Sequence, residues 1–419
     1  MTSTASNGPG FFGELLDPAH RVDPYPLYER MRAAGPVRLG SMPVVVLSSH
    51  ADCTAVLRHR DAAVDRSHAA IPMGPTPVHD LAGEFGAGLT GIAPMLFRDA
   101  PDHTRLRRLV AAAFTPARVR GLEPRITALA DAALDRAGAR GALDIVADLA
   151  YPLPVTVICE LLGVPPVDEP RIREWSGLLA RTLDPIAAVG AGRPDPAELV
   201  RASNELHGYF EQLTRYRRTR PGTDLLSELI AAEASGAALT HDELIATCGL
   251  LLIAGHETTV NLISNTVLAL LRQRHHLAIL RGARAFAGAV IEESLRFDPP
   301  VHLVPRIARA PIPLPGIDLE RGDLVILMLA AANRDPAVFA DPGRFDPARH
   351  DRHLAFGLGQ HFCLGAPLAR LEATVAINRF AARVRRPRLS EDPPPYRAHV
   401  TLRGPAAIEV EFDAIAPAA

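Results

Sequence analysis

A cysteine flanked by glycines has the most distinctive chemical setting in this chain. Cys363 lies in the segment FGLGQHFCLGAPLAR, between Gly359 and Gly365, and the proline four residues later fits the first turn of a helix. Glycines let backbone N–H groups approach the sulfur, and a helix N-terminus near His361 and Arg370 favours the thiolate. Metal-ligating thiolates need such donors. The pattern therefore favours a metal ligand over a buried structural thiol.

A second polar group interrupts an apolar stretch. Glu257 is the only carboxylate in residues 244–271, and a carboxylate inside an apolar helix costs free energy unless it is paired or hydrated. Gly255 costs about 1 kcal/mol relative to alanine in a helix, and a Thr258 hydroxyl bonded to the Ala254 carbonyl bends a helix. These residues predict a polar notch that holds water or a small ligand. The alternative is a buried acid paired with a distant arginine; a zinc-protease H-E-x-x-H site is excluded because a valine occupies the second histidine position.

A third pattern places opposite charges one helical turn apart. Glu293 and Arg296 lie on a helical pattern just before the Asp-Pro-Pro segment at 298–300. Alone, this spacing is an ordinary ion pair on a helix, worth roughly 0.2–0.5 kcal/mol. It becomes informative only in combination with the cysteine segment.

The three patterns together resemble the cytochrome P-450 superfamily in its bacterial form, a family of haem-thiolate monooxygenases. The haem-loop pattern F-x-x-G-x-[HR]-x-C-x-G of that family is matched by Phe356, Gly359, His361, Cys363 and Gly365. The E-x-x-R pattern is matched by Glu293 and Arg296, and the A-G-x-[DE]-T pattern by Ala254, Gly255, Glu257 and Thr258. The resemblance extends over residues 24–404, nearly the whole chain.

The resemblance implies a haem b (iron protoporphyrin IX) whose axial ligand is the Cys363 thiolate. Two haem propionates need several fixed donors, and the positions that match the family's propionate partners are His103, Arg107, Arg306 and His361. Further haem contacts are implied at Phe356, Gly359, Gly365 and Ala254. The Glu293–Arg296 pair looks like the family's buried scaffold pair, whose third member is implied to be Arg344.

Catalytic roles follow from the same resemblance. Thr258 and Glu257 resemble the alcohol–acid pair that accepts water and relays protons to iron-bound O2. Relatives that use peroxide lack this threonine, so the intact pair implies a monooxygenase that receives electrons from NAD(P)H. His256 is expected to be a spacer.

The implied partners are redox proteins. No reductase segment follows Gly365 in this sequence, so electrons are expected to arrive through a separate ferredoxin and ferredoxin reductase. The arginines expected on the cysteine side, where an acidic partner would dock, are Arg108, Arg349, Arg352 and Arg370. The alternative is that they form a solvated basic face. A monomer is expected.

By position in the family, mostly small and apolar residues line the substrate pocket. They come from residues 73–97, 179–189, 250–251, 254, 301–304 and 401–402, and they include Leu96, Leu250, Val301, His302, Val304 and Leu402. Such a lining favours a lipophilic substrate, for example a polyketide, macrolide, terpenoid or steroid. His302 either meets a substrate oxygen or points to solvent. Hydroxylation is the first expectation, with epoxidation next.

Three alternatives stay open at this point. The protein is a haem-thiolate enzyme that catalyses oxidative coupling, or a haem-binding sensor without turnover, or a helical binding protein in which Cys363 is only a structural thiol. The intact Glu257–Thr258 pair argues against the sensor.

Positioning these residues requires a mainly α fold with small β-sheets, a single haem-centred domain over residues 13–419, and a disordered tail at 1–12. Thr240 and Glu243 have the spacing of a capping box, and they begin a helix over 240–272 of about 50 Å that is apolar almost all round and therefore buried. A membrane span is disfavoured because polar residues interrupt it. Other helices are predicted at 51–59, 102–114, 122–137, 155–162 and 367–380, strands at 44–47, 324–329 and 408–412, and irregular segments at 67–97 and 184–196.

Composition narrows the remaining classes. The 419 residues contain 45 arginines, no lysine and 47 acidic residues, for a formal net charge of −2. A near-neutral chain offers no general attraction to nucleic acid or anionic membranes, and mechanisms that need a lysine are excluded. The four cysteines form no close pair, so neither a disulfide framework nor a zinc site is indicated. With no signal peptide or long apolar run, a cytoplasmic protein is expected.

Overall fold

The structure is a computed structural model that describes residues 8–70, 93–180, 195–235 and 239–418. It is mainly helical with small sheets, as predicted. The helices of the described part are α1 (Gly8–Leu16), α2 (Tyr25–Ala34), α3 (His50–Arg58), α5 (Asp102–Ala111), α6 (Pro116–Gly121), α7 (Glu123–Arg140), α8 (Pro152–Leu161), α9 (Glu169–Ala180), α10 (Pro196–Thr219), α11 (Leu225–Ala234), α12 (His241–Arg272), α13 (Arg274–Gly282), α14 (Ala287–Phe297), α15 (Leu329–Ala332) and α16 (Ala366–Arg383).

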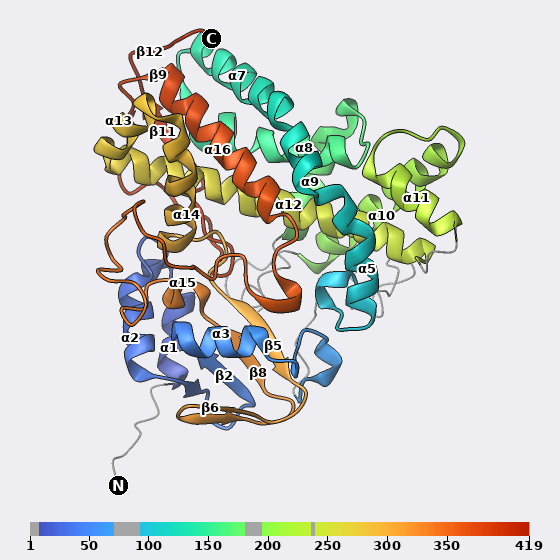
Figure 1. Ribbon diagram of the computed structural model, residues 1–419, viewed down its shortest axis with the longest axis vertical. Helices are drawn as coiled ribbons and strands as arrows, with labels where there is room; N and C mark the ends of the chain where they lie inside the picture. Colours follow the sequence, from blue (N-terminus) through green and yellow to red (C-terminus); the bar gives the residue numbers. More distant parts are fainter. Residues whose placement is uncertain (1–7, 71–92, 181–194, 236–238, 419) are drawn as a thin grey trace.

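The strands are short. The largest sheet lies at one end of the molecule, away from the long helices, whereas other strands lie at the opposite end, beside α7 and α16 (Figure 1). The largest sheet has the order β1-β2-β8-β5-β3, in which β2 and β8 run parallel and the other neighbours antiparallel. The other sheets are β10-β11-β4, β12-β9 and β6-β7. Their bounds are β1 (Val37–Arg38), β2 (Val44–Leu47), β3 (Ala62–Ala63), β4 (Leu143–Asp144), β5 (Val304–Ala308), β6 (Ile312–Leu314), β7 (Ile317–Leu319), β8 (Leu324–Leu327), β9 (Val384–Arg385), β10 (Arg388–Leu389), β11 (Glu409–Glu411) and β12 (Ala414–Ile415).

Most predicted elements are confirmed. The strand at 44–47 is β2, and the helices predicted at 51–59, 122–137, 155–162 and 367–380 correspond to α3, α7, α8 and α16. The helix predicted over 102–114 is α5 as far as Ala111, and its last turn, Ala112–Phe114, is a 3-10 helix. The irregular segments lie largely outside the described residues.

The prediction of a disordered tail over residues 1–12 is wrong from Gly8 onward, where α1 begins. The spacing of Phe11 and Leu15 puts both on one face of α1, and both are buried against a cluster that includes Leu27 of α2 and Met328. Burial of these side chains holds the segment on the domain.

Helix α12 is the central element of the fold. It crosses the middle of the molecule between α8 and α16 (Figure 1), and its 32 residues correspond to about 48 Å. The predicted capping box is present: the Thr240 hydroxyl accepts the Glu243 N–H at 3.3 Å, and the Glu243 carboxylate accepts the Thr240 N–H at 3.0 Å. In the described part of the chain, no helix is long and apolar enough to cross a membrane.

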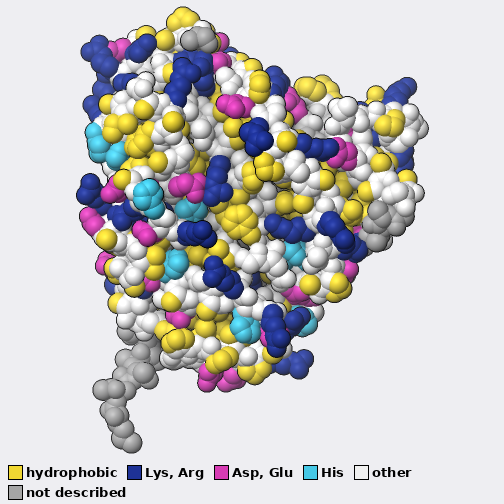
Figure 2. Space-filling view, in the orientation of Figure 1, with side chains coloured by type: hydrophobic (Ala, Val, Ile, Leu, Met, Phe, Trp, Pro, Cys, Tyr) yellow, Lys and Arg dark blue, Asp and Glu magenta, His cyan; other side chains and the backbone are white. Residues whose placement is uncertain are grey.

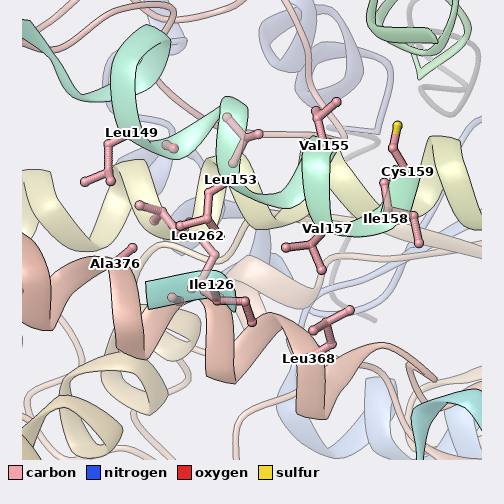
Figure 3. Packing of buried hydrophobic residues seen from close by; sticks show 14 of the residues in the cluster. Ile126, Leu149, Leu153, Val155, Val157, Ile158, Cys159, Leu262, Leu368 and Ala376 are labelled. Atoms are coloured by element: carbon pink, nitrogen blue, oxygen red, sulfur yellow. The ribbon is translucent and has the colours of Figure 1, made fainter. Parts of the chain in front are cut away.

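Apolar side chains of α8 and α16 close the core around α12. Figure 3 shows Leu153 of α8 beside Leu262 of α12, with Ile126 of α7 above α16. All three are at most 2 % exposed. Because such interiors are close-packed, α12 and α16 are held in a fixed relation. Helix α12 carries the polar notch, and the cysteine loop leads into α16.

The capping carboxylate of α12 also anchors the segment before α5. Glu243 accepts hydrogen bonds from Arg105 at 2.7 and 2.9 Å and from Arg98 at 3.2 Å. The Arg105 guanidinium holds the pKa of Glu243 at about 2, well below its ordinary value, although burial opposes this. One side chain therefore fixes the start of α12 relative to α5.

We expect Glu243→Gln to lower the stability at neutral pH and to flatten its acid dependence. A pKa held low in the folded state gives stability that is complete above the unfolded value and is lost as the pH falls from about 4.5 towards 2. The shift sets an upper limit of about 3 kcal/mol, which partial exposure of the arginines reduces to roughly 1–2 kcal/mol. Thermal unfolding of wild type and variant between pH 7 and about 3 measures the difference. Glu160→Gln, which breaks an exposed pair with Arg125, is the control, and parallel curves for wild type and Glu243→Gln contradict the prediction.

Candidate active site

Cys363 lies on a tight loop that leads into α16. Its N–H donates to the Phe356 carbonyl at 2.9 Å, and the chain before it turns through Gly357 and Gly359 with φ of +67° and +71°. A side chain at position 359 would place its Cβ 2.6 Å from the Leu57 carbonyl oxygen. Glycine at 359 is thus required by both the backbone conformation and the close approach of α3.

The electrostatic setting of the sulfur is more balanced than the sequence suggested. Burial raises the pKa of the Cys363 thiol, while backbone hydrogen bonds from Gly365 and Ala366 and the charges of Arg107 and Arg370 lower it. The net direction is upward, because burial outweighs the donors and the two charges. The predicted N–H donors are nevertheless present, and they suit a sulfur that becomes anionic when it ligates a metal ion.

A cluster of nitrogen donors lies beside the cysteine loop. The rings of His103 on α5 and His361 are 4.0 Å apart, and His103 Nδ1 and His361 Nε2 are buried without a hydrogen-bond partner among the described residues. Arg306 on β5 is 9 % exposed and donates to the Pro305 carbonyl. Burial lowers the pKa of His103 to about 4 and that of Arg306 to about 10, so the guanidinium stays charged at neutral pH.

These donors fit the two carboxylates of a haem. Buried polar atoms are normally satisfied, and the structure brings a charged arginine and two unsatisfied imidazoles to one place from three distant parts of the sequence. The nearest charged group to His361 Nε2 in this cluster is the Asp99 carboxylate, whose Oδ1 lies 3.9 Å away. Arg107 donates to the Phe362 carbonyl at 2.7 Å, directly beside Cys363. The four predicted propionate partners therefore lie together. His361 is on the cysteine loop, His103 stacks on it, Arg107 binds the loop backbone, and the charge of Arg306 acts on His361.

The polar notch in α12 has the predicted hydrogen bond. Thr258 donates to the Ala254 carbonyl at 3.1 Å, and Thr259 donates to the Gly255 carbonyl at 3.2 Å. The alternative for the acid is also realised: Glu257 is paired with Arg397 at 2.5 Å. The sequence analysis did not single out Arg397, because nothing in its local pattern connects it with a helix 140 residues earlier.

His256 is more than a spacer between the notch residues. Its side chain is fully buried, with Nδ1 2.8 Å from the Leu252 carbonyl and Nε2 3.5 Å from the Ser176 hydroxyl. Nε2 is also 3.7 Å from Glu257. The imidazole therefore packs α12 against α9.

The scaffold pair is buried as predicted, but its third member differs. Arg296 donates to both Glu293 oxygens at 2.7 and 2.8 Å, and both side chains are 2 % exposed. Arg344 contributes only its backbone carbonyl, 3.0 Å from Arg296, and its side chain is exposed. The arginine side chain beside Glu293 is Arg349, at 3.5 Å. The assignment of Arg344 is wrong because the chain turns its side chain to solvent and brings in the arginine five residues later.

The predicted pocket residues are only partly brought together. Val301 and Leu402 form an isolated antiparallel bridge, Leu250 is buried on α12, and Val304 begins β5. Leu96 is 37 % exposed in the described structure. Most of the segments 73–97 and 179–189 lies outside the described residues.

His302 does not point to solvent, and its ring nitrogens face protein groups. It is 1 % exposed, with Nδ1 2.7 Å from the Tyr28 hydroxyl and Nε2 3.5 Å from Asp298. Burial lowers its pKa to about 4. The alternative that His302 points to solvent is thus wrong, because the ring joins α2 to the segment after α14. Contact between His302 and a substrate oxygen stays a prediction.

The arginines expected to dock a partner fall into two groups. Arg349 is 12 % exposed and donates to the carbonyls of Ala340 and Asp341, so it is part of the scaffold; Arg370 is paired with Glu292. Arg108 and Arg352 are exposed. Figure 2 shows arginine side chains bordering hydrophobic ones across the middle of one face, and Phe362, next to the cysteine, is 38 % exposed.

Comparisons with known proteins agree with this geometry. The family profile described as Cytochrome P450 matches residues 193–410. Cytochrome P450 monooxygenase PikC of Streptomyces venezuelae is 40 % identical over 365 residues, covering 85 % of this chain and 82 % of that protein. Vitamin D(3) 25-hydroxylase of Pseudonocardia autotrophica is 40 % identical over 374 residues, covering 86 % of each.

Solved structures extend the similarity to the whole fold. Ligand-free CYP164A2 of Mycobacterium smegmatis superposes with a TM-score of 0.87 at 48 % identity, covering 96 % of this chain and 99 % of that one. Members of the family use O2 and a haem iron bound by a cysteine thiolate. The chain belongs to this family and is a cytochrome P450 monooxygenase.

Proposed function

We propose that this enzyme inserts one oxygen atom of O2 into a lipophilic small molecule, most simply by hydroxylation. The observation that carries the proposal is Cys363 at the N-terminus of α16, with the unsatisfied imidazoles of His103 and His361 beside its loop. The apolar residues Val301 and Leu402 support a lipophilic substrate. So does the vitamin D(3) hydroxylase among the relatives, and steroids, terpenoids, polyketides and macrolides are the classes we expect.

The cofactor would be held from several elements at once. Cys363 supplies the sulfur ligand, while Arg306, His103 and His361 supply fixed donors for the propionates, with Arg107 beside them. Phe356 and Gly359 shape the loop, and Gly365 and Ala366 donate N–H groups to the sulfur. When bound, a haem with a thiolate ligand supplies the activation of O2.

The chain's own part in proton transfer is assigned to the notch in α12. The Thr258 hydroxyl donates to the Ala254 carbonyl, which leaves its oxygen lone pairs free to accept a hydrogen bond from water. Glu257, held by Arg397, is the neighbouring group that can take up and give a proton. Hydrogen bonds of a threonine hydroxyl to the carbonyl four residues back favour a bend in a helix, and we expect water to bind at this turn of α12.

The proposed electron donors are a ferredoxin and its NAD(P)H-dependent reductase. Arg108 and Arg352 are exposed, and so is the Phe362 side chain next to Cys363, and we propose that they belong to the surface that meets an acidic partner. A monomeric enzyme of the cytoplasm that binds neither membrane nor nucleic acid agrees with the near-neutral net charge.

The proposal is tested by spectroscopy and then by product analysis. The reduced protein with carbon monoxide is expected to show the strongly red-shifted Soret band of a thiolate-ligated haem. A panel of lipophilic metabolites is then screened for a spin-state shift, and the binders are incubated with ferredoxin, reductase, NAD(P)H and isotope-labelled O2. One labelled oxygen atom in the product supports the proposal; absence of the red-shifted band refutes it.

We expect Thr258→Ala to keep substrate binding and to lower product formed per electron consumed by about tenfold to a hundredfold, since a positioned proton-transfer group contributes on the order of 100-fold or more. Electron consumption and product are measured together. Thr259→Ala is the matched control, because Thr259 donates to its own helix in the same way. Unchanged coupling in Thr258→Ala, or equal loss in both variants, contradicts the role.

A further inference from the structure

The partner of Glu257 comes from the C-terminal part of the chain. Arg397 Nη1 is 2.5 Å from Glu257 Oε2 and 3.5 Å from Asn261 Oδ1, one turn further along α12. The two charged side chains are only 13 % and 18 % exposed. Charge-assisted hydrogen bonds with this little solvent around them fix geometry more strongly than exposed pairs do.

Arg397 belongs to a hairpin that is tightly fitted to α12. We define the C-terminal hairpin as residues 396–405: Tyr396 and Pro405 form an antiparallel bridge, and the Arg397 N–H donates to the Gly404 carbonyl at 3.3 Å. A Cβ on Gly404 would lie 2.1 Å from Asn261 Oδ1. The base of the hairpin thus touches α12 through both Arg397 and Gly404.

The same hairpin carries a residue of the expected substrate pocket. Leu402 bridges Val301, and the Arg403 guanidinium binds Asp298 at 2.9 Å, both in the segment that follows α14. The hairpin is therefore attached on one side to the notch of α12 and on the other side to the pocket segment.

We propose that Arg397 is a positioning residue for Glu257: it holds the carboxylate at the notch and ties its position to the hairpin that carries Leu402. The role of Glu257 in proton transfer rests on the proposed function. Two neutral groups also lie near the acid: His256, at 3.7 Å, whose pKa is lowered by burial, and Tyr151, whose pKa is raised by burial. A second cation, Arg173, stacks on the Tyr151 ring at 4.7 Å and acts on His256 and Tyr151 through its charge. The direct ionic contact to Glu257 comes from Arg397.

The test measures product per electron in three variants, Arg397→Gln, Glu257→Gln and the double variant. Each is loaded with haem and supplied with redox partners and a lipophilic metabolite that the wild type hydroxylates. We expect Arg397→Gln to lower product per electron by about tenfold, because misplacement of a reacting group costs up to about 100-fold. The double variant should lose no more than Glu257→Gln, since Arg397 acts through the acid. Arg397→Lys, which keeps the charge, should recover most of the coupling, whereas Arg397→Met should not.

Arg272→Gln is the matched control. It removes another arginine–carboxylate pair of α12, with Asp392, whose side chains are 40 % and 46 % exposed, and it should leave coupling unchanged. Losses that multiply in the double variant, or unchanged coupling in Arg397→Gln, overturn the proposal.

A second measurement needs no turnover. The thermal midpoints of wild type, both single variants and the double variant form a cycle for the contact itself. Arg397→Gln should lower the midpoint less in the Glu257→Gln background than in wild type. Additive shifts of the thermal midpoint in the double variant overturn the inference. Because this measurement requires no product, failure of the inference is distinct from failure of the proposed monooxygenase activity.

Discussion

Replacement of Cys363 by serine is expected to abolish the red-shifted Soret band of the reduced carbon monoxide complex and O2-dependent product formation together. A serine hydroxyl does not ionise near neutral pH, so the anionic sulfur ligand is lost. The fold should survive, because serine is similar in size and can accept the hydrogen bonds from Gly365 and Ala366. Absorption spectra, product analysis and circular dichroism measure the three properties.

Cys53→Ser is the control for this substitution. Cys53 is also buried, and its sulfur donates to the Leu47 carbonyl at 3.5 Å, a bond that serine can keep. The variant should retain the red-shifted band. Persistence of that band in Cys363→Ser would remove the ligand assignment.

The second large effect is expected for Arg296→Met, which should lower the free energy of unfolding by about 3–5 kcal/mol, the usual cost of leaving one partner of a buried ion pair alone. Arg296 binds both Glu293 oxygens and the carbonyls of Asn333, Pro342 and Arg344. A loss of that size is a large part of a total stability of about 5–15 kcal/mol. Denaturant unfolding and haem content after expression measure it.

Arg125→Met provides the comparison with an exposed pair. Arg125 binds Glu160, and the side chains are 52 % and 37 % exposed, so the loss should stay below about 1 kcal/mol. Equal losses in the free energy of unfolding for Arg296→Met and Arg125→Met would show that burial does not determine how much Arg296 contributes to stability.

Local patterns gave the central helix and the cysteine loop. The capping box at Thr240 and Glu243 placed the start of α12 correctly within one residue, because the motif satisfies N–H groups of the same helical turn. Glycine and cysteine spacing likewise described a loop whose hydrogen bonds are short in sequence, such as Cys363 N–H to the Phe356 carbonyl.

Contacts between distant segments were not predictable in the same way. Arg397 meets Glu257 across 140 residues, and His302 is held by Tyr28 across 274 residues; no spacing in either local sequence selects these partners. Arg344 and Arg349 are both arginines after the same turn, and only the path of the backbone decides which one reaches Glu293. Burial of Phe11 against α2 likewise depends on tertiary packing, which overrides the low helix propensity of the three glycines and one proline in residues 8–13.

The C-terminal hairpin has a consequence for altering the enzyme. Arg397 and Arg403 fasten its two sides to Glu257 and Asp298, while the residues between them reach the bridge of Leu402 with Val301. The two arginines therefore mark the ends of a short segment whose side chains can be varied while both ion pairs are kept. On the proposed function, libraries confined to positions 398–402 should change which molecules are accepted and where they are oxidised, while Glu257 and Thr258 stay unchanged.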